Sequence, residues 1–477
     1  MDCFGTIKVV IYLIKIVTKN LSLEEIMESK QRFKKALIPA QMMVLSFAGV
    51  IFIGALLLML PISSQARVVT PFINTLFTAT SAVCVTGLVV VDTGTYWSVF
   101  GKTVILVLIQ IGGLGFMTMT TSIAIVLGKK IGLKNRLVMQ EALNQFSISG
   151  VIRLTKYVIM ATVFIEFIGA VVLSTRFVPI FGWKNGLYYS VFHSVSAFCN
   201  AGFDLMGNYA SLTAFAKDPV VSLTIMILII FGGLGFAVIA DLSTFKSYRK
   251  LSLHSKLVIL VTSILLISGF LAIFTLEYNN PKTIGDFTLG QKFVASMFHS
   301  VTPRTAGFNT LDLNGLTMPS RFITMILMFI GGSPGSTAGG LKTTTFGLMI
   351  LSIIAVFKGA DEINFAGRRI AKEAVSRALT IVFISAIWIV SMTFLLTVFE
   401  PMHSLESIVF ESLSAFGTVG LSLGLTPQLG FMGKIILTLM MFFGRLGPLT
   451  IVLALSKKAS KSGRDLLRYP EGKIIVG

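Results

Sequence analysis

Four times along the chain, two long apolar stretches flank a short half-polar segment that ends in glycine. Most of the apolar stretches reach the ~20 residues that a helix needs to cross a bilayer. Because backbone exposed to lipid must satisfy its own hydrogen bonds, such stretches have to fold as helices. The repeat therefore predicts four similar membrane-embedded units in a single polypeptide.

The composition excludes most other classes of protein. Of the 477 residues, 54% are hydrophobic and 13% are charged, whereas a soluble protein carries about 25% charged residues. So little charge excludes a soluble enzyme and a disordered chain. The three cysteines imply no disulfide framework.

The charge that is present predicts the topology. The formal net charge is +19, and 29 of the 40 Lys and Arg residues lie in five clusters, at 1–38, 129–156, 246–256, 342–377 and 457–473. An excess of Lys and Arg marks the cytoplasmic side of a membrane protein. We therefore expect a multi-pass protein in the lipid bilayer, with both termini cytoplasmic and no nucleic-acid partner.

The repeat is visible residue by residue. Segments 77–87, 192–202, 297–307 and 410–420 align without gaps, and each ends in glycine. A second conserved column of the repeat lies 24 to 30 residues further on, as Gly112-Gly113, Gly232-Gly233, Gly331-Gly332 and Gly444-Arg445. Tandem duplication without function in the connecting segments is the alternative interpretation.

Each unit is expected to contain two long helices and one re-entrant helix. The long helices are predicted at 39–60, 102–127, 155–178, 220–243, 257–277, 321–354, 374–399 and 431–455. The segments at about 72–84, 187–199, 290–302 and 404–416 are too short to cross and carry Ser, Thr and His, which indicates re-entrant helices. The predicted fold is an all-α membrane protein with four membrane–pore–membrane units around a pseudo-fourfold pore. A cytoplasmic amphipathic N-terminus (1–38) and tail (457–477) flank units at 39–128, 154–244, 256–355 and 372–456.

The four glycine-ended turns have the character of an ion filter. Irregular backbone at membrane depth is tolerated where it lines a wet cavity, and glycine allows carbonyls to point at a common axis. Rings of carbonyls replace the hydration shell of K⁺, and no carboxylate lies in these turns. We predict K⁺ at the carbonyls of Gly87, Gly202, Gly307 and Gly420. The filter residues are Val85, Thr86, Gly87, Asn200, Ala201, Gly202, Thr305, Ala306, Gly307, Thr418, Val419 and Gly420.

Two departures from the repeat suggest a gate. The second long helix of unit three contains a run that cannot be a regular helix: Gly331, Gly332, Ser333, Pro334, Gly335, Ser336, Thr337, Ala338, Gly339 and Gly340. A helix kink is the alternative, and the match to a phosphate loop fails because one residue too many precedes Lys342.

Arg445 is the second departure, since it stands where the other units have glycine. A charge at the bilayer centre is costly and faces a cavity or a partner. Directed into the pore, Arg445 would raise the barrier to cations. The alternative is a buried ion pair with Glu166, Asp241 or Glu411. His193 and His299 are expected to be packed polar residues of the pore helices. Arg304, beside the third turn, is expected to pair with the ends of pore helices and not to contact the ion.

On these repeats and motifs the chain resembles the Trk/Ktr/HKT superfamily of potassium transporters, over residues 36–477. It is most similar to the bacterial KtrB-type membrane subunit, because no helix pair precedes unit one. The resemblance implies that the four turn glycines form the filter, that 331–340 is an intramembrane gating loop, and that Arg445 restricts permeation beside it. In the plant branch, serine at the first filter glycine accompanies sodium preference, so Gly87 implies potassium.

The resemblance also implies partners. It predicts a homodimer with a pore in each protomer, stimulation by Na⁺, and a separate cytosolic ring of the RCK/KTN type that binds adenine nucleotide. The chain itself is expected to bind no cofactor, to be no enzyme, and to lie in a bacterial plasma membrane with its tail (468–477) at the dimer interface. A Na⁺-selective or K⁺/Na⁺-cotransporting relative is the nearer alternative function, and a secondary carrier of another solute the more remote one.

Overall fold

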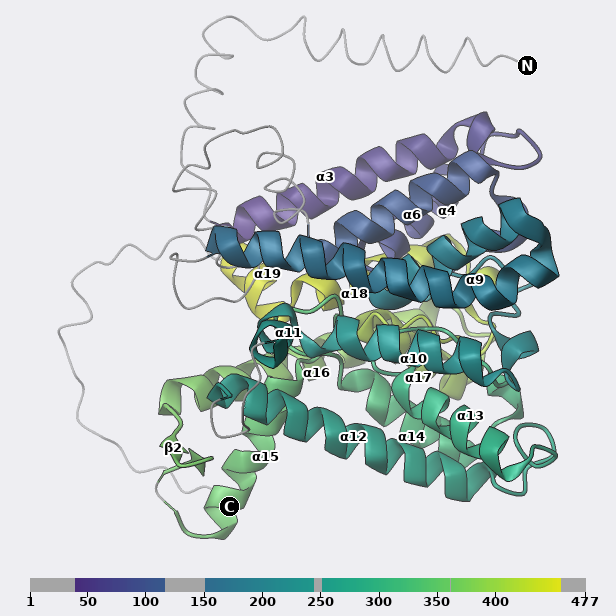
Figure 1. The fold of residues 1–477 in the computed structure, drawn as a ribbon. Coiled ribbons are helices and arrows are strands. Elements are labelled where there is room, and N and C mark those ends of the chain that lie inside the picture. The colour runs from purple at the N-terminus through teal and green to yellow at the C-terminus, as the bar shows by residue number, and fades with distance from the viewer. Residues whose placement is uncertain (1–38, 116–150, 244–250, 361, 456–477) are drawn as a thin grey trace, which may run out of the picture.

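The computed structural model describes residues 39–115, 151–243, 251–360 and 362–455. The expected N-terminal amphipathic segment and the tail, with the basic clusters at 1–38 and 457–473, lie outside the described residues. The chain is predominantly helical, with one two-stranded hairpin among the described residues (Figure 1).

The elements follow the predicted units in order. Unit one comprises α3 (Pro39–Met59), α4 (Phe72–Val83), α5 (Thr93–Tyr96) and α6 (Val99–Leu114). Unit two comprises α9 (Val151–Phe198), α10 (Pro219–Leu234) and α11 (Phe236–Ser243). Unit three comprises α12 (Leu253–Glu277), α13 (Leu289–Val301), α14 (Met318–Phe329) and α15 (Thr343–Phe357). The hairpin β1 (Asn364–Phe365) and β2 (Arg368–Arg369) then leads to unit four, with α16 (Lys372–Phe399), α17 (Leu405–Gly417), α18 (Phe431–Leu446) and α19 (Pro448–Leu455).

The first long helix of every unit matches its prediction. In the described part of the chain, four helices are long and apolar enough to cross a membrane: α3, α9, α12 and α16. Two bent pairs, α10 with α11 and α18 with α19, also pass that test when each pair is taken together. Large apolar side chains such as Phe383 and Phe394 of α16 are exposed, which is the surface that lipid requires. The chain is a multi-pass membrane protein.

The short helices also lie where they were predicted. Helices α4, α13 and α17 occupy the expected segments, and each is buried along its C-terminal half. In unit two the short helix is the last part of α9, which changes direction at Gly182 (φ 77°), three residues after Pro179. Figure 1 shows the turns that join long helices to short ones at one end of the molecule, and the β1–β2 hairpin at the other.

The second long helices differ from the prediction. We expected an interruption in unit three alone, and continuous helices at 220–243 and 431–455. The structure instead bends by 103° between α10 and α11 and by 96° between α18 and α19. Each of the helices α6, α10 and α18 ends at a glycine with positive φ, namely Gly115, Gly235 and Gly447. Units two and four therefore share the break, and unit three differs by placing a long loop there. The second part of the helix predicted at 102–127 lies outside the described residues.

Candidate functional site: four turns and a loop

The four glycine-ended turns meet around one axis. Their last glycines all have positive φ, between 70° and 93°. A Cβ on Gly87 would lie 2.5 Å from the carbonyl oxygen of Ala201, and one on Gly202 would lie 2.7 Å from that of Ala306. The series continues from Gly307 to the Val419 carbonyl, at 2.5 Å, and closes from Gly420 to the Thr86 carbonyl. The turns thus form a closed ring in the chain order of the units.

A second strained position accompanies each glycine. The residue two places before it also has positive φ: Val85 (50°), Asn200 (57°), Thr305 (68°) and Thr418 (51°). Positive φ is uncommon for residues other than glycine and is an outlier for a β-branched residue such as valine or threonine. The sequence carries no signal for this feature, because three of these four residues, the valine and the two threonines, favour extended backbone.

The backbone amides of the turns are bonded outward, to the pore helices. The Thr86, Ala201 and Val419 N–H groups donate to the carbonyls of Ser81, Ser196 and Ser414, each at 2.8 Å. The Gly87 N–H also donates to Ser81 Oγ (3.1 Å), as the Gly420 N–H does to Ser414 Oγ (3.0 Å).

The carbonyls of the twelve filter positions have no such partners. None of them accepts a hydrogen bond from another group in the described part of the chain. Buried carbonyls are nearly always paired, so twelve unpaired ones in four turns that close a ring are a specific feature. A ring of oxygen acceptors is what a desolvated monovalent cation requires.

The third turn is one residue shorter than the gapless alignment predicted. Ser194 Oγ donates to the carbonyl of Glu166 in unit two, and Ser300 Oγ donates to that of Leu266 in unit three. Ser196 and Thr302 likewise bond the carbonyls of Phe203 and Phe308. The pore helices therefore match as Phe192-His-Ser-Val with Phe298-His-Ser-Val. Residues 302–307 of unit three then span what residues 196–202 span in unit two.

In units one, two and four, the second column of glycines lets the second helix approach a pore helix. A Cβ on Gly112, Gly232 or Gly444 would overlap the carbonyl of Val83, Phe198 or Phe416, respectively. These carbonyls belong to the C-terminal turns of the pore helices or to the residues that end them. Glycine at these positions therefore allows the second helices to pack directly behind the turns of these units.

The segment 331–340 forms an irregular loop that packs against unit two and against the fourth turn. The Ser333 and Thr337 N–H groups donate to the carbonyls of Gly233 (2.9 Å) and Gly232 (3.1 Å), and the Gly335 carbonyl accepts from the Phe236 N–H at 2.8 Å. A Cβ on Gly339 would collide with the side chain of Thr418. The predicted interruption is therefore present, and it is an ordered loop held mainly by unit two.

Arg445 lies beside this loop. Its guanidinium donates to the carbonyls of Thr337 and Gly112 and to that of Gly113 at 3.2 Å. It thus links the helices of units four and one to the loop of unit three. The ion-pair alternative is wrong: none of the ion pairs among the described residues involves Arg445. Glu166 bonds Gln110, and Glu411 bonds Ser422 and Thr426.

The two histidines are packed as predicted. His193 Nδ1 bonds the Tyr189 carbonyl at 2.7 Å, and its Nε2 accepts from the Leu205 N–H at 3.3 Å. His299 Nε2 bonds Thr324 Oγ1 at 3.0 Å. Within the described ranges, no three His, Cys, Asp or Glu side chains gather as a metal site would require.

Comparisons with known proteins agree with this architecture. Residues 6–463 match the TrkH family model, described as a cation transport protein. The chain is 46% identical to the Ktr system potassium uptake protein B of Bacillus subtilis, over 92% of this chain and 97% of that relative. It is 43% identical to the potassium/sodium uptake protein NtpJ of Enterococcus hirae, over 94% and 99% of the two chains. The crystal structure of the potassium transporter TrkH from Vibrio parahaemolyticus has the same fold, with a TM-score of 0.68 and 19% identity over 87% of this chain and 83% of that one.

Proposed function

The chain belongs to the TrkH family of cation transport proteins and is KtrB-like within the Trk/Ktr superfamily; from this premise we propose that it is the potassium-translocating membrane subunit of a K⁺ uptake system. The observation that carries the proposal is the closed ring of twelve unpaired carbonyls at the four filter turns. K⁺ sheds its water there and is held by the carbonyls of Gly87, Gly202, Gly307 and Gly420.

The attraction for the cation needs no acidic side chain. The C-terminal ends of the four pore helices lead into the ring, and the C-terminus of a helix carries a partial negative charge. Carbonyl dipoles complete the site, and the filter positions hold no charged residue. Selection between K⁺ and Na⁺ then depends on the size of the ring and on the number of its carbonyls.

The gate is formed by Arg445 and the loop 331–340, on the inner side of the ring. Support comes from the bonds of the guanidinium to the carbonyls of Thr337, Gly112 and Gly113. A fixed positive charge at this level raises the electrostatic barrier to cations. Movement of the loop would remove the Thr337 carbonyl from the Arg445 guanidinium and let the Arg445 side chain leave the ion path.

The remaining features of the proposal rest on the family and on the names of its relatives. The ions move down their electrochemical gradient, with Na⁺ as an activator. The subunit is a homodimer in a bacterial plasma membrane, with both termini cytoplasmic, and a separate nucleotide-binding ring of the RCK/KTN type opens it.

Rubidium uptake tests the proposal directly. In cells that lack other potassium uptake systems, the protein with a regulatory ring subunit should restore Rb⁺ uptake, and Na⁺ should stimulate it. Removal of residues 333–338 should give Rb⁺ flux without the ring subunit. Uptake that stays at the background of the empty cell, with the protein present in the membrane, would contradict the proposal.

A Na⁺-selective or K⁺/Na⁺-cotransporting function is the second candidate, favoured by the name of the Enterococcus relative. Replacing Gly87 by Ser separates the two functions. A Cβ there would lie 2.5 Å from the Ala201 carbonyl, so the substitution should displace one carbonyl of the ring and shift selectivity toward Na⁺. A wild type that already takes up both ions equally would favour the second candidate. Competition by other solutes would favour the more remote one, a secondary carrier.

A further inference from the structure

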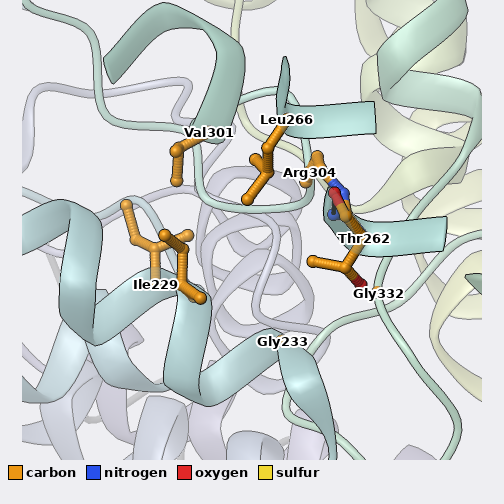
Figure 2. Close-up of a pocket in the computed structure, with 8 residues that line it drawn as sticks. Ile229, Gly233, Thr262, Leu266, Val301, Arg304 and Gly332 are labelled. Carbon is orange, nitrogen blue, oxygen red and sulfur yellow. Dashed lines mark hydrogen bonds between the residues drawn. The ribbon is translucent and has the colours of Figure 1, made fainter. Parts of the chain in front are cut away.

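A small cavity lies behind the third filter turn, between α10 of unit two and α12 of unit three. Figure 2 shows Ile229 and Val301 along one side of it, and Leu266, Arg304 and Thr262 on the other. About 20 Å³ is open to the centre of a water-sized sphere, and a single water needs about 10–15 Å³ by that measure. The cavity is thus large enough for one water molecule.

Two of the residues that line this cavity each carry a polar side-chain atom without a protein partner. Arg304 is 7% exposed and Thr262 is 8% exposed. Arg304 Nε and Thr262 Oγ1 find no hydrogen-bond partner among the described residues. A buried donor without a partner costs about 1–3 kcal/mol. A guest that accepts from Nε and bonds the hydroxyl would remove that cost.

The corresponding place between units one and two is filled by polar side chains. Gly169 and Gly269 occupy equivalent positions, because a Cβ on either would lie 2.5 Å from the hydroxyl of the matching serine, Ser194 or Ser300. Counting from them, Glu166 matches Leu266 and Thr162 matches Thr262. Gln110 and Ile230 are also equivalent, because each lies two residues before a glycine pair of the repeat.

Between units one and two, Gln110, Glu166 and Cys199 contact one another at the end of the pore helix. Between units two and three, Ile230 and Leu266 supply no polar atom, and Arg304 lies where Cys199 lies in unit two. The shorter third turn thus places a guanidinium in a site whose neighbours are apolar.

Arg304 also joins the two functional elements. It belongs to the third filter turn, and its guanidinium donates to the Gly331 carbonyl, at the start of the gate loop, at 3.3 Å. A second nitrogen donates to the Thr262 carbonyl at 3.4 Å. Both bonds are long, so the orientation of the guanidinium depends on what holds Nε.

We propose that the cavity binds one water molecule, which bonds Arg304 Nε and Thr262 Oγ1, and that the hydrated Arg304 is a positioning residue that ties the third filter turn to the gate loop. The terms filter and gate rest on the proposed function, whereas the water site does not. A halide ion could also receive hydrogen bonds from a guanidinium, and the crystallographic test distinguishes a halide from water.

Crystals of the full-length protein grown in bromide in place of chloride test the site. A single density peak within hydrogen-bond distance of both atoms, without anomalous signal, is the expected result. An anomalous bromide peak would overturn the proposal in favour of an anion, and a cavity without density would overturn it outright. The density in the cavity tests the water site independently of whether the protein transports K⁺.

Rubidium flux without the ring subunit tests the positioning role. Thr262→Val should remove the water and raise this basal flux about fivefold, since one unsatisfied donor is worth about that factor. Thr262→Ser keeps the hydroxyl and should leave the flux unchanged. Thr162→Val is the matched control and should leave the flux unchanged, because Thr162 is the equivalent residue of unit two, is also buried, and its hydroxyl also has no described partner.

A rescue separates positioning from general damage to the fold. Adding Leu266→Gln to Thr262→Val places an amide where Glu166 lies in unit two, and its oxygen should accept from Arg304 Nε in place of the water. The double variant should return the basal flux to that of the wild type. Equal flux for Thr262→Val and wild type, or no rescue by the amide, would overturn the positioning role.

Discussion

At the filter, a missing methyl group decides how closely the turns approach one another. Each of the four glycines faces a backbone carbonyl of the next turn, so a side chain there meets an atom that cannot move aside alone. Each also has positive φ, which costs other residues about 1–2 kcal/mol. The effect of close approach and the effect of φ can be separated experimentally, because unit four offers a matched pair of glycines.

Gly420→Ala should reduce K⁺ selectivity over Na⁺ by about tenfold, whereas Gly424→Ala should not change it. Gly420 has φ 93° and faces the Thr86 carbonyl, while Gly424 has φ 91° and no atom within 4 Å of a Cβ. Both variants carry the same backbone strain, of about 1–2 kcal/mol, and only the first displaces a filter carbonyl. Competition of Na⁺ with Rb⁺ uptake is the measurement. Equal effects of the two variants would show that strain alone is responsible.

Asp204 follows the second filter turn by two residues, outside the helices. The pKa of this carboxyl is raised to about 7, chiefly by burial; a hydrogen bond from the Met206 N–H opposes the shift, and the nearby Asp92 adds to it. The carboxyl is therefore neutral at pH 6 and charged at pH 8. A negative charge near the entrance raises the local concentration of cations.

The KM for Rb⁺ should accordingly fall about two- to threefold as external pH rises from 6 to 8, by this attraction. Asp204→Asn should keep the high KM at both values of pH. A wild-type KM that is independent of pH, or one that still depends on pH in Asp204→Asn, would contradict this role.

At the scale of elements, the breaks in the second helices matter more than their lengths. Helices α10 and α18 end in the same way, at Gly235 (φ 95°) and Gly447 (φ 82°), and both continue at nearly a right angle. Their surroundings differ. A Cβ on Gly235 would lie 2.8 Å from the Pro334 carbonyl of the gate loop, whereas Gly447 has no atom within 4 Å.

Gly235→Ala should therefore raise Rb⁺ flux in the absence of the ring subunit, because the added methyl displaces the loop. Gly447→Ala has the same φ requirement and should leave this flux unchanged. Expression in cells without the ring subunit, with protein level measured in the membrane fraction, makes the comparison. A basal flux that rises equally in both variants would assign the effect to the helix break and not to the loop.

The bends between α10 and α11 and between α18 and α19 could not be predicted from the sequence. Gly232-Gly-Leu-Gly and Gly444-Arg-Leu-Gly lie inside apolar runs that are long enough for one continuous helix, and glycine is tolerated in such helices. The loop in unit three was predictable because its run of Gly with Pro334 is longer than any helix accepts. The one-residue deletion in the third turn did carry a signal, the shared Phe-His-Ser-Val of 192–195 and 298–301, which the gapless alignment misses.

At the scale of the molecule, the fourfold repeat predicted the fold, because four copies of one short segment have to meet if each lines the same path. The sequence could not predict which carbonyls remain unpaired, since this depends on the positive φ of Val85 and its three counterparts. It also could not predict the partners of Arg445, because backbone carbonyls have no signature in sequence.

The surplus of positive charge and the path for a positive ion are separate features of the molecule. The described filter positions carry no charge, while Arg304 lies behind the third turn and Arg445 bonds carbonyls on its inner side. In the proposed mechanism a chain with a net charge of +19 conducts a cation because the attraction comes from carbonyls and helix ends. Most of the basic residues lie in clusters of the sequence that contain none of the four turns.

The central claim is that the four turns form one cation site from neutral carbonyls. Thallium(I) substitutes for K⁺ and scatters anomalously, so crystals of the full-length protein soaked in Tl⁺ test the claim most directly. We expect an anomalous peak on the axis of the ring, in contact with the carbonyls of Gly87, Gly202, Gly307 and Gly420, which excess K⁺ removes. A ring without a peak, or Tl⁺ bound only at acidic side chains elsewhere, would contradict it.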